Sequence, residues 1–141
     1  MNKGKIFEEK SFKLIKKSFG DRPVFPERSI TTHYGGKRKI DISVGNTGSF
    51  DFIIFECKDK KHIGIDAIDQ VFSQGSAVKA SKIAVIGNGK FTRDAIKYAK
   101  SINCSLFNVI NPEDEAIRPK VFVKILTHFR WIQKISFGFV L

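Results

Sequence analysis

The pattern of apolar and polar residues predicts an amphipathic helix at the start of the chain. Between residues 5 and 19, apolar side chains recur at an approximately helical spacing among lysines and glutamates. Gly20 follows, at a position where a glycine often ends a helix. Residues 24–34 then favour an irregular strand that Pro26 interrupts, since proline donates no hydrogen bond to a neighbouring strand.

Two strand patterns come next, and a turn with the sequence GNTGS joins them. Residues 38–44 alternate, with apolar side chains on one face and Asp41 and Ser43 on the other, which predicts a half-buried strand. The run FDFIIFECK is nearly continuously apolar until its last residues. Such a run is typical of a central strand buried on both faces, so we expect the two strands to pair as a hairpin.

Helices and strands alternate in the following part of the chain. Asp66 is placed to cap a helix, residues 82–87 predict a central strand, Thr92 is placed to cap a further helix, and residues 104–110 predict another strand. The order of helix, three strands, helix, strand, helix and strand predicts an α/β sandwich with helices flanking a mixed central sheet. Residues 118–141 contain two more apolar alternations, which indicate one or two added strands.

Length and charge narrow the range of functions. A chain of 141 residues fits one domain, and we expect residues 1–141 to form a single unit with its core at about residues 4–110. Lys and Arg number 25 against 14 Asp and Glu, which gives a net charge of +11. Such a chain is attracted to polyanions, nucleic acid first and an anionic membrane surface second. The alternative is a solvated basic surface that has no dedicated partner.

The sequence indicates a cytoplasmic protein that has no membrane segment. No apolar run is long enough to span a bilayer, and the N-terminus carries no apolar signal region. Cys57 and Cys104 are far apart in the sequence and fit buried thiols in a reducing compartment. The three histidines are scattered without the spacing of zinc ligands, so a structural zinc site is not expected.

The candidate chemistry lies at Asp41, Glu56 and Lys58. Glu56 and Lys58 are two residues apart on one strand, so their side chains leave the same face, next to the strand that carries Asp41. Charged side chains directly after a buried apolar run are costly to bury unless they act as ligands or have partners. The alternative is a salt bridge between Glu56 and Lys58 at the end of a strand, with Asp41 in solvent.

Hydrolysis of a phosphodiester requires residues of these types. A divalent cation has to bridge the phosphate, a water has to be activated, and the charge on phosphorus has to be neutralised. The carboxylate oxygens of Asp41 and Glu56 suit Mg²⁺, and the main-chain carbonyl of Cys57 offers a further metal ligand. Lys58 is placed to hold the attacking water and to help lower its pKa.

Several motifs in order resemble the PD-(D/E)xK nuclease superfamily, most closely the Mrr-type restriction endonuclease domains. The motifs that carry the resemblance, over about residues 4–108, are KRKIDISV, FIIFECKDK, IDAIDQVFSQ and KIAVIGNGKFTRDAIKYAKSINCSLF. The resemblance implies a restriction endonuclease-like three-layer sandwich and a single nuclease domain. Two departures are that Ile40 stands where the superfamily motif has proline, and that the GFT-like segment Gly89–Thr92 is one residue longer.

Carried over to this sequence, the resemblance implies that Asp41 and Glu56 ligate the metal and that Lys58 acts on the water or the phosphate. Glu8, in the first helix, matches an additional acidic residue that many members have, which holds a metal-bound water or a second metal. The alternative for Glu8 is a surface glutamate on an amphipathic helix, and its neighbour Glu9 is a second candidate. The implied cofactor is Mg²⁺, for which Mn²⁺ is expected to substitute.

Basic and polar residues near the predicted site are candidates for nucleic-acid contacts. The candidates that we expect to bind the backbone are Lys37, Arg38, Lys39, Lys60, Lys61 and Gln70. For Lys60 and Lys61 a merely solvated charge run fits equally well, and for Gln70 the alternative is an ordinary polar helix position.

The sequence therefore predicts a metal-dependent endonuclease that hydrolyses DNA by attack of a metal-activated water. Its expected partner is DNA, and the sequence leaves open whether the chain forms a homodimer. One alternative is a DNA-binding module of the same fold that does not cleave, although the complete set of Asp41, Glu56 and Lys58 argues for activity. The other is a nuclease that acts on RNA or on branched DNA, as junction resolvases do.

Overall fold

A computed structural model describes residues 2–19, 21–110 and 122–125, and its centre is a six-stranded mixed sheet. The strand order is β1–β4–β5–β7–β9–β10. β5, β7 and β9 are parallel, whereas β1, β4 and β10 run antiparallel to their neighbours. The strands of this sheet are β1 (Val24–Phe25), β4 (Ile42–Val44), β5 (Ile53–Lys58), β7 (Lys82–Gly87), β9 (Cys104–Ile110) and β10 (Phe122–Ile125).

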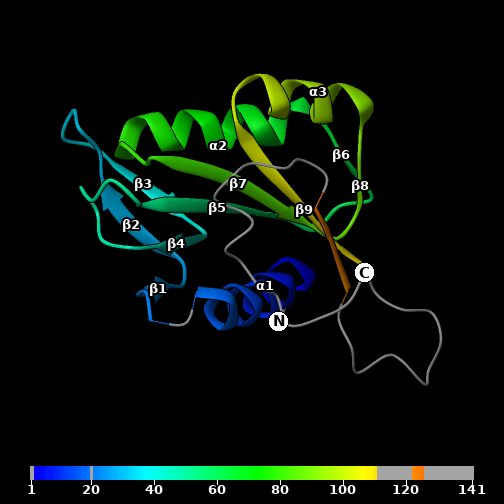
Figure 1. Ribbon diagram of the computed structural model, residues 1–141, viewed down its shortest axis with the longest axis horizontal. Helices are drawn as coiled ribbons and strands as arrows, with labels where there is room; N and C mark the ends of the chain where they lie inside the picture. Colours follow the sequence, from blue (N-terminus) through cyan, green and yellow to red (C-terminus); the bar gives the residue numbers. More distant parts are fainter. Residues whose placement is uncertain (1, 20, 111–121, 126–141) are drawn as a thin grey trace.

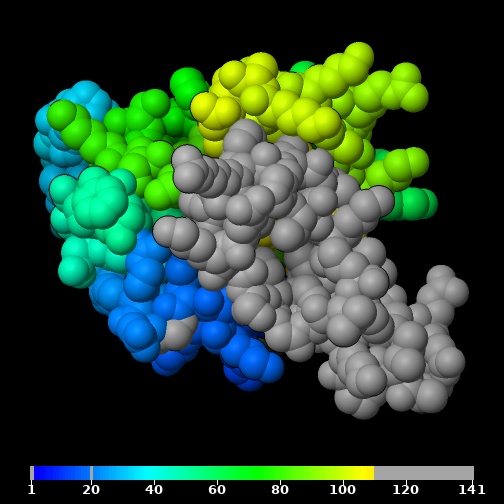
Figure 2. All heavy atoms as spheres, in the orientation of Figure 1, coloured from blue at the N-terminus to red at the C-terminus, as the bar shows by residue number. Residues whose placement is uncertain are grey.

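Helices cover both faces of this sheet, and the result is a three-layer sandwich (Figure 1). α1 (Lys3–Phe19) lies on one face, and α2 (Ile65–Val78) and α3 (Arg93–Ser101) lie on the other. In the space-filling view, the atoms of α1 and those of α3 lie on opposite sides of the molecule (Figure 2). The structure thus confirms the expected restriction endonuclease-like arrangement of a mixed sheet between helices. Among the described residues, no helix is long and apolar enough to cross a membrane.

The alternation of side chains along β5 produces two separate hydrophobic cores. Ile54 packs toward α2 and α3, in a cluster that also contains Val71 and Leu106. Ile53 and Phe55 point to the other face and pack with residues of α1. Both faces of β5 are buried, as the continuous apolar run predicts. A central strand of this kind is a rigid support for the polar residues at its end.

Two small sheets lie beside the large one. β2 (Arg28–Thr31) pairs antiparallel with β3 (Lys37–Ile40), and β6 (His62–Ile63) pairs in parallel with β8 (Lys90–Phe91). The second pair joins the loop that follows β5 to the segment that precedes α3. Gly89 makes this junction possible, because its main chain passes so close to the carbonyl oxygen of Lys60 that no side chain fits there.

The structure corrects the expected single strand over residues 38–44. The strand is interrupted at Asp41. As a result, β3 belongs to a small sheet and β4 to the large one. β4 is also buried on both faces, with Ser43 inside, rather than half-buried. The alternation of apolar and polar residues continues through this interruption, because Ile40 before Asp41 and Ile42 after it are both buried. The periodic pattern alone therefore cannot reveal the change of sheet.

The ends of the helices follow the sequence signals in one case and not in the other. The hydroxyl of Thr92 caps α3 and accepts a hydrogen bond of 3.1 Å from the N–H of Ala95, as expected. The prediction that Asp66 caps α2 is wrong: Gly64 occupies the cap position without a side-chain hydrogen bond, and Asp66 lies in the first turn. β10 confirms one added strand within residues 118–141, and the other expected strand there lies outside the described residues.

Candidate active site

Asp41 lies at the break between β3 and β4, beside the end of β5. Because β4 pairs with β5 so that Ile42 stands opposite Phe55, the Asp41 side chain reaches the residues that follow Phe55. Its Oδ2 atom accepts a hydrogen bond of 2.9 Å from the main-chain N–H of Cys57. The carboxylate of Asp41 is thereby fixed next to the Glu56-Cys57-Lys58 segment.

Glu56 and Lys58 share one face of β5, as their spacing predicts. The Nζ atom of Lys58 lies 3.6 Å from Oε1 of Glu56, whose side chain is only 6% exposed. The same Nζ donates a hydrogen bond of 2.9 Å to Oε1 of Gln70, a residue of α2. Gln70 therefore lies against the site, where it orients the ammonium group of Lys58. The ion pair of the alternative interpretation is present, but it is one contact of a larger group that includes Gln70 and Asp41.

The carboxyl groups of Asp41 and Glu56 influence each other's ionisation. Burial, followed by the charge of Asp41, raises the pKa of Glu56 to about 7, against the opposing effect of Lys58. Burial also raises the pKa of Asp41, while the N–H of Cys57 works in the opposite direction. Two carboxyl groups in one desolvated place cannot both ionise easily, so the pair retains a proton near neutral pH when no cation is present.

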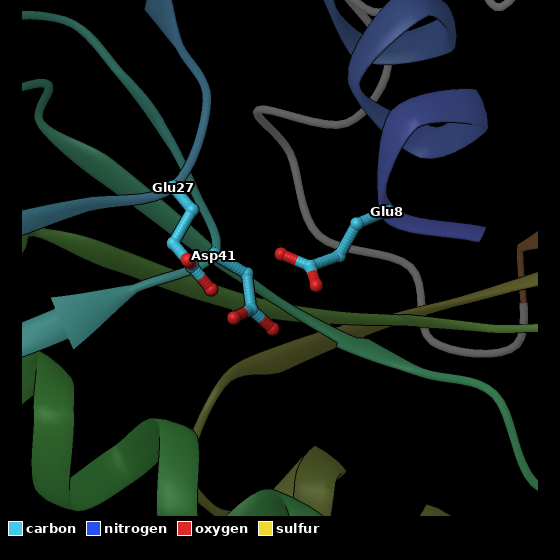
Figure 3. A group of neighbouring side chains, drawn as sticks. All are labelled: Glu8, Glu27 and Asp41. Atoms are coloured by element: carbon cyan, nitrogen blue, oxygen red, sulfur yellow. The ribbon is translucent and has the colours of Figure 1, made fainter. Parts of the chain in front are cut away.

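Asp41 also belongs to a second group of acids, which Figure 3 shows. One carboxylate oxygen from each of Glu8, Glu27 and Asp41 lies within 4.8 Å of the others. Glu8 comes from α1 and Glu27 from the segment between β1 and β2. Burial and the charge of Asp41 raise the pKa of Glu8. The three residues line a pocket of about 270 Å³. Asp41 therefore interacts both with this group and with Glu56.

Lysines partly neutralise this second group. Nζ of Lys5 lies 3.0 Å from a carboxylate oxygen of Glu27 and 3.7 Å from one of Glu8. Nζ of Lys39 lies 4.0 Å from Glu27. The hydrogen bond to Glu27, with the charges of Glu8 and Asp41, raises the pKa of Lys5. A positive charge is therefore stabilised at this position.

The donor set fits a hard divalent cation. The carboxylates of Glu8, Glu27 and Glu56 lie around that of Asp41, and oxygen donors of this kind are those that Mg²⁺ binds. Burial, with a smaller effect from neighbouring carboxylates, raises the pKa values of Glu8, Asp41 and Glu56, so a cation bound here would favour their ionised forms. Burial raises the pKa of the Cys57 thiol well above its ordinary value, so the thiol stays neutral and does not suit a soft metal.

The expected nucleic-acid residues lie on two sides of this site. Lys37 and Lys39 are exposed on β3, and Arg38 from the same strand reaches Ser73 Oγ on α2 at 3.4 Å. Lys60 and Lys61 are exposed on the loop that follows β5, and Nζ of Lys60 lies 3.9 Å from Asp66. Lys39 is the member of this set that touches the acidic group, through Glu27.

Glu27 and Lys5 are the residues of this site that the sequence pattern does not reveal. Glu27 follows Pro26 in an irregular segment, where no periodicity assigns it to a face. Lys5 is one of many lysines in a predicted amphipathic helix. The nearest local signal is that Lys5 lies three residues before Glu8, and residues at that spacing are neighbours on a helix.

The fold is that of the PD-(D/E)xK nucleases, a mixed sheet between helices. Asp41 lies at a strand junction, and Glu56 and Lys58 lie at the end of the next strand, as in the motif of that superfamily. The restriction endonuclease family, in its Mrr-type catalytic form, matches residues 4–110, and the chain belongs to this family. It thus carries a catalytic-type domain of the restriction endonuclease-like superfamily.

A solved structure shows the same fold. It is that of AF1548, a protein of unknown function, with a TM-score of 0.59 and 16% sequence identity. The similarity covers 70% of this chain and 54% of AF1548, so this chain spans about half the length of that protein. No curated protein sequence matches this chain.

Proposed function

We propose that the protein is a metal-dependent endonuclease that hydrolyses the phosphodiester bonds of DNA. The observation that carries the proposal is the position of Asp41, whose carboxyl group joins the Glu56–Lys58 pair to the acidic group of Glu8 and Glu27. An arrangement of oxygen donors beside one lysine suits the cleavage of a phosphodiester. Membership of the restriction endonuclease family supports the same reaction.

In this proposal the carboxylates of Asp41 and Glu56, with Glu8 and Glu27 beside them, hold Mg²⁺ or Mn²⁺. Such a cation, when bound, polarises the phosphate and lowers the pKa of water. The hydrogen bond from the main-chain N–H of Cys57 holds the Asp41 side chain in place. The carboxylate of Asp41 therefore needs little rearrangement to act as a ligand.

Lys58 supplies the positive charge that stabilises the transition state. Its ammonium group is held by Glu56 at 3.6 Å and by Gln70 at 2.9 Å, and the side chain remains 23% exposed. An ammonium in this position can donate to the attacking water or to a phosphate oxygen. Gln70 acts as a positioning residue, because it contacts Lys58 rather than the carboxylates.

DNA is the substrate that the charge and the family favour. The net charge of +11 suits a polyanion, and restriction endonucleases cut DNA. The rival substrates are RNA and branched DNA, and the rival function is DNA binding without cleavage. The presence of Asp41 beside the Glu56–Lys58 ion pair favours a catalytic protein over a binding module.

A panel of substrates tests the proposal. Supercoiled plasmid, linear duplex, a four-way junction, single-stranded DNA and RNA are each incubated with the protein in Mg²⁺, Mn²⁺ or EDTA. We expect cutting of duplex DNA within the chain in Mg²⁺ or Mn²⁺ and none in EDTA. Cutting of RNA alone, or cutting that persists in EDTA, would contradict the proposal.

A further inference from the structure

Helix α3 carries a row of basic side chains on its outer face. Arg93, Lys97 and Lys100 are all exposed, and their spacings of four and three residues place them on one side of the helix. Lys90, which is also exposed, precedes the helix on β8. The opposite side of α3 packs into the core through Ala95 and Ala99, so the basic row faces outward. Figure 2 shows the atoms of α3 on the molecular surface.

Among the residues that the structure describes, these four basic side chains differ from the lysines of the active site in having no acidic partner. Within residues 2–19, 21–110 and 122–125, no carboxylate oxygen lies within 4.0 Å of their charged nitrogens. Lys5, Lys58 and Lys60, by contrast, each have at least one such neighbour. The positive charge of the row is therefore available to an external anion.

The row is continuous with the surface beside the active site. The four residues line a hollow of about 800 Å³ that meets a second hollow, of about 1240 Å³, at Lys90. Lys60 and Lys61 line the second hollow, and they follow Lys58 directly in sequence. The pairing of β6 with β8 and a hydrogen bond of 2.9 Å from Lys90 N to Lys61 O hold the two parts together.

The dimensions of the row fit a nucleic-acid backbone. The eight residues from Arg93 to Lys100 span about 10 Å along the helix axis. Over a length of about 10 Å, one strand of duplex DNA carries about three phosphates. Three basic side chains therefore meet about three phosphates. No base-reading geometry is needed for such contacts, which makes them independent of sequence.

We propose that Lys90, Arg93, Lys97 and Lys100 bind the phosphate backbone of the duplex that flanks the cleaved bond. The inference rests on the proposed nuclease function and extends the bound DNA from the active site, past Lys60 and Lys61, onto α3. The affinity of this nuclease for DNA then depends on a surface that lies outside the predicted contacts on β3 and on the loop after β5.

Two triple variants with the same loss of charge test this proposal. The first is Arg93→Gln, Lys97→Gln and Lys100→Gln on α3. The control is Lys13→Gln, Lys16→Gln and Lys17→Gln, three exposed lysines of α1, on the other face of the sheet. Binding to two unrelated 30-base-pair duplexes is measured in Ca²⁺ over a range of salt concentrations. Thermal unfolding of each variant verifies that it is folded.

For the α3 variant, we expect the slope of log affinity against log salt to flatten by about two to three units on both duplexes. The same loss lowers affinity by roughly 100-fold at 0.1 M salt. The control should keep the slope of the wild-type protein. An α3 variant with the wild-type slope, or equal losses in both variants, would overturn the proposal.

The experiment separates failure of this inference from failure of the nuclease proposal. Binding in Ca²⁺ does not depend on turnover, so a wild-type protein that binds but never cuts refutes only the nuclease proposal. A wild-type protein that cuts DNA, together with a folded α3 variant whose salt dependence is unchanged, refutes only the inference about α3.

Discussion

The main-chain N–H of Cys57, on β5, donates a hydrogen bond of 2.9 Å to Oδ2 of Asp41, at the junction between β3 and β4. Asp41 therefore has a structural role as well as its proposed chemical one: it satisfies a main-chain donor at the end of the central strand. The two roles can be separated by substitution, because an amide side chain can accept this hydrogen bond but is a poor metal ligand.

Asp41→Asn and Asp41→Ala should both abolish cleavage but differ in stability. Alanine leaves the Cys57 N–H without its partner, which costs on the order of 1 kcal/mol relative to asparagine. Urea denaturation of both variants in EDTA measures the difference. Equal stability of the two variants would show that this hydrogen bond contributes nothing, and cleavage by either variant would remove Asp41 from the metal site.

The stability of the metal-free protein should fall as the pH rises from about 4.5 to about 7. The pKa of Glu56 is about 7 in the folded protein and near its ordinary value of 4.5 in the unfolded chain. Between these values the unfolded chain loses its proton first, so stability that is fully present below pH 4.5 is lost as the pH rises through 7. The loss is about 3 kcal/mol.

Glu56→Gln should remove much of this pH dependence, because glutamine does not titrate. The comparison is urea denaturation in EDTA at several pH values, with Glu9→Gln as the control because Glu9 is exposed. The Glu9→Gln protein should follow the wild-type curve. If wild type and Glu56→Gln lose stability in parallel between pH 4.5 and 7, Glu56 is not the buried acid of the folded state.

Lys5→Met should tighten the binding of divalent metal. The ammonium of Lys5 lies against Glu27 and Glu8 and competes with a metal for the same carboxylates. The side chain is 46% exposed, so we expect only a small effect, up to about fivefold in affinity. Calorimetric titration with Mg²⁺ or Ca²⁺ measures it without DNA or turnover. The control Lys13→Met, on the exposed face of α1, should bind the metal as wild type does. Weaker metal binding by Lys5→Met would contradict this prediction and mean that Lys5 organises the site.

Gly89→Ala should destabilise the protein and displace the loop that carries Lys60 and Lys61. An added methyl group would collide with the main-chain oxygen of Lys60 and lie 2.7 Å from that of Lys61, and main chain cannot move aside cheaply. We expect a loss of about 1–3 kcal/mol, measured by urea denaturation. In Gly36→Ala the nearest atom belongs to the exposed side chain of Tyr34, at 3.1 Å, so this control should stay near wild type. Unchanged stability in Gly89→Ala would contradict the tight packing of this junction.

Local signals in the sequence predict much of the fold. The cap at Thr92 and the strands at residues 82–87 and 104–110 depend on neighbouring residues, and the structure confirms them. The position of Asp66 shows the limit of such signals. An acid in the first turn of a helix interacts favourably with the helix dipole without capping it, so its presence does not fix where the helix begins.

The site itself is only partly accessible to sequence reasoning. Glu56 and Lys58 can be predicted to lie together because side chains two apart on a strand share a face. The interruption of the strand at Asp41 cannot be predicted in this way, because the residues on both sides of it are buried as they would be in a continuous strand. Glu27 reaches the site through the path of an irregular segment and the packing of α1, neither of which has a periodic signature.

Cleavage of supercoiled plasmid by wild type and Lys58→Ala tests the central claim most directly. Both proteins are assayed in Mg²⁺ and in EDTA, with Lys13→Ala as the control for loss of one lysine. We expect wild type and the control to nick or linearise the plasmid in Mg²⁺ only, and a folded Lys58→Ala protein to lose at least about 100-fold in rate. A folded Lys58→Ala protein that cuts at the wild-type rate would contradict the assignment of this site.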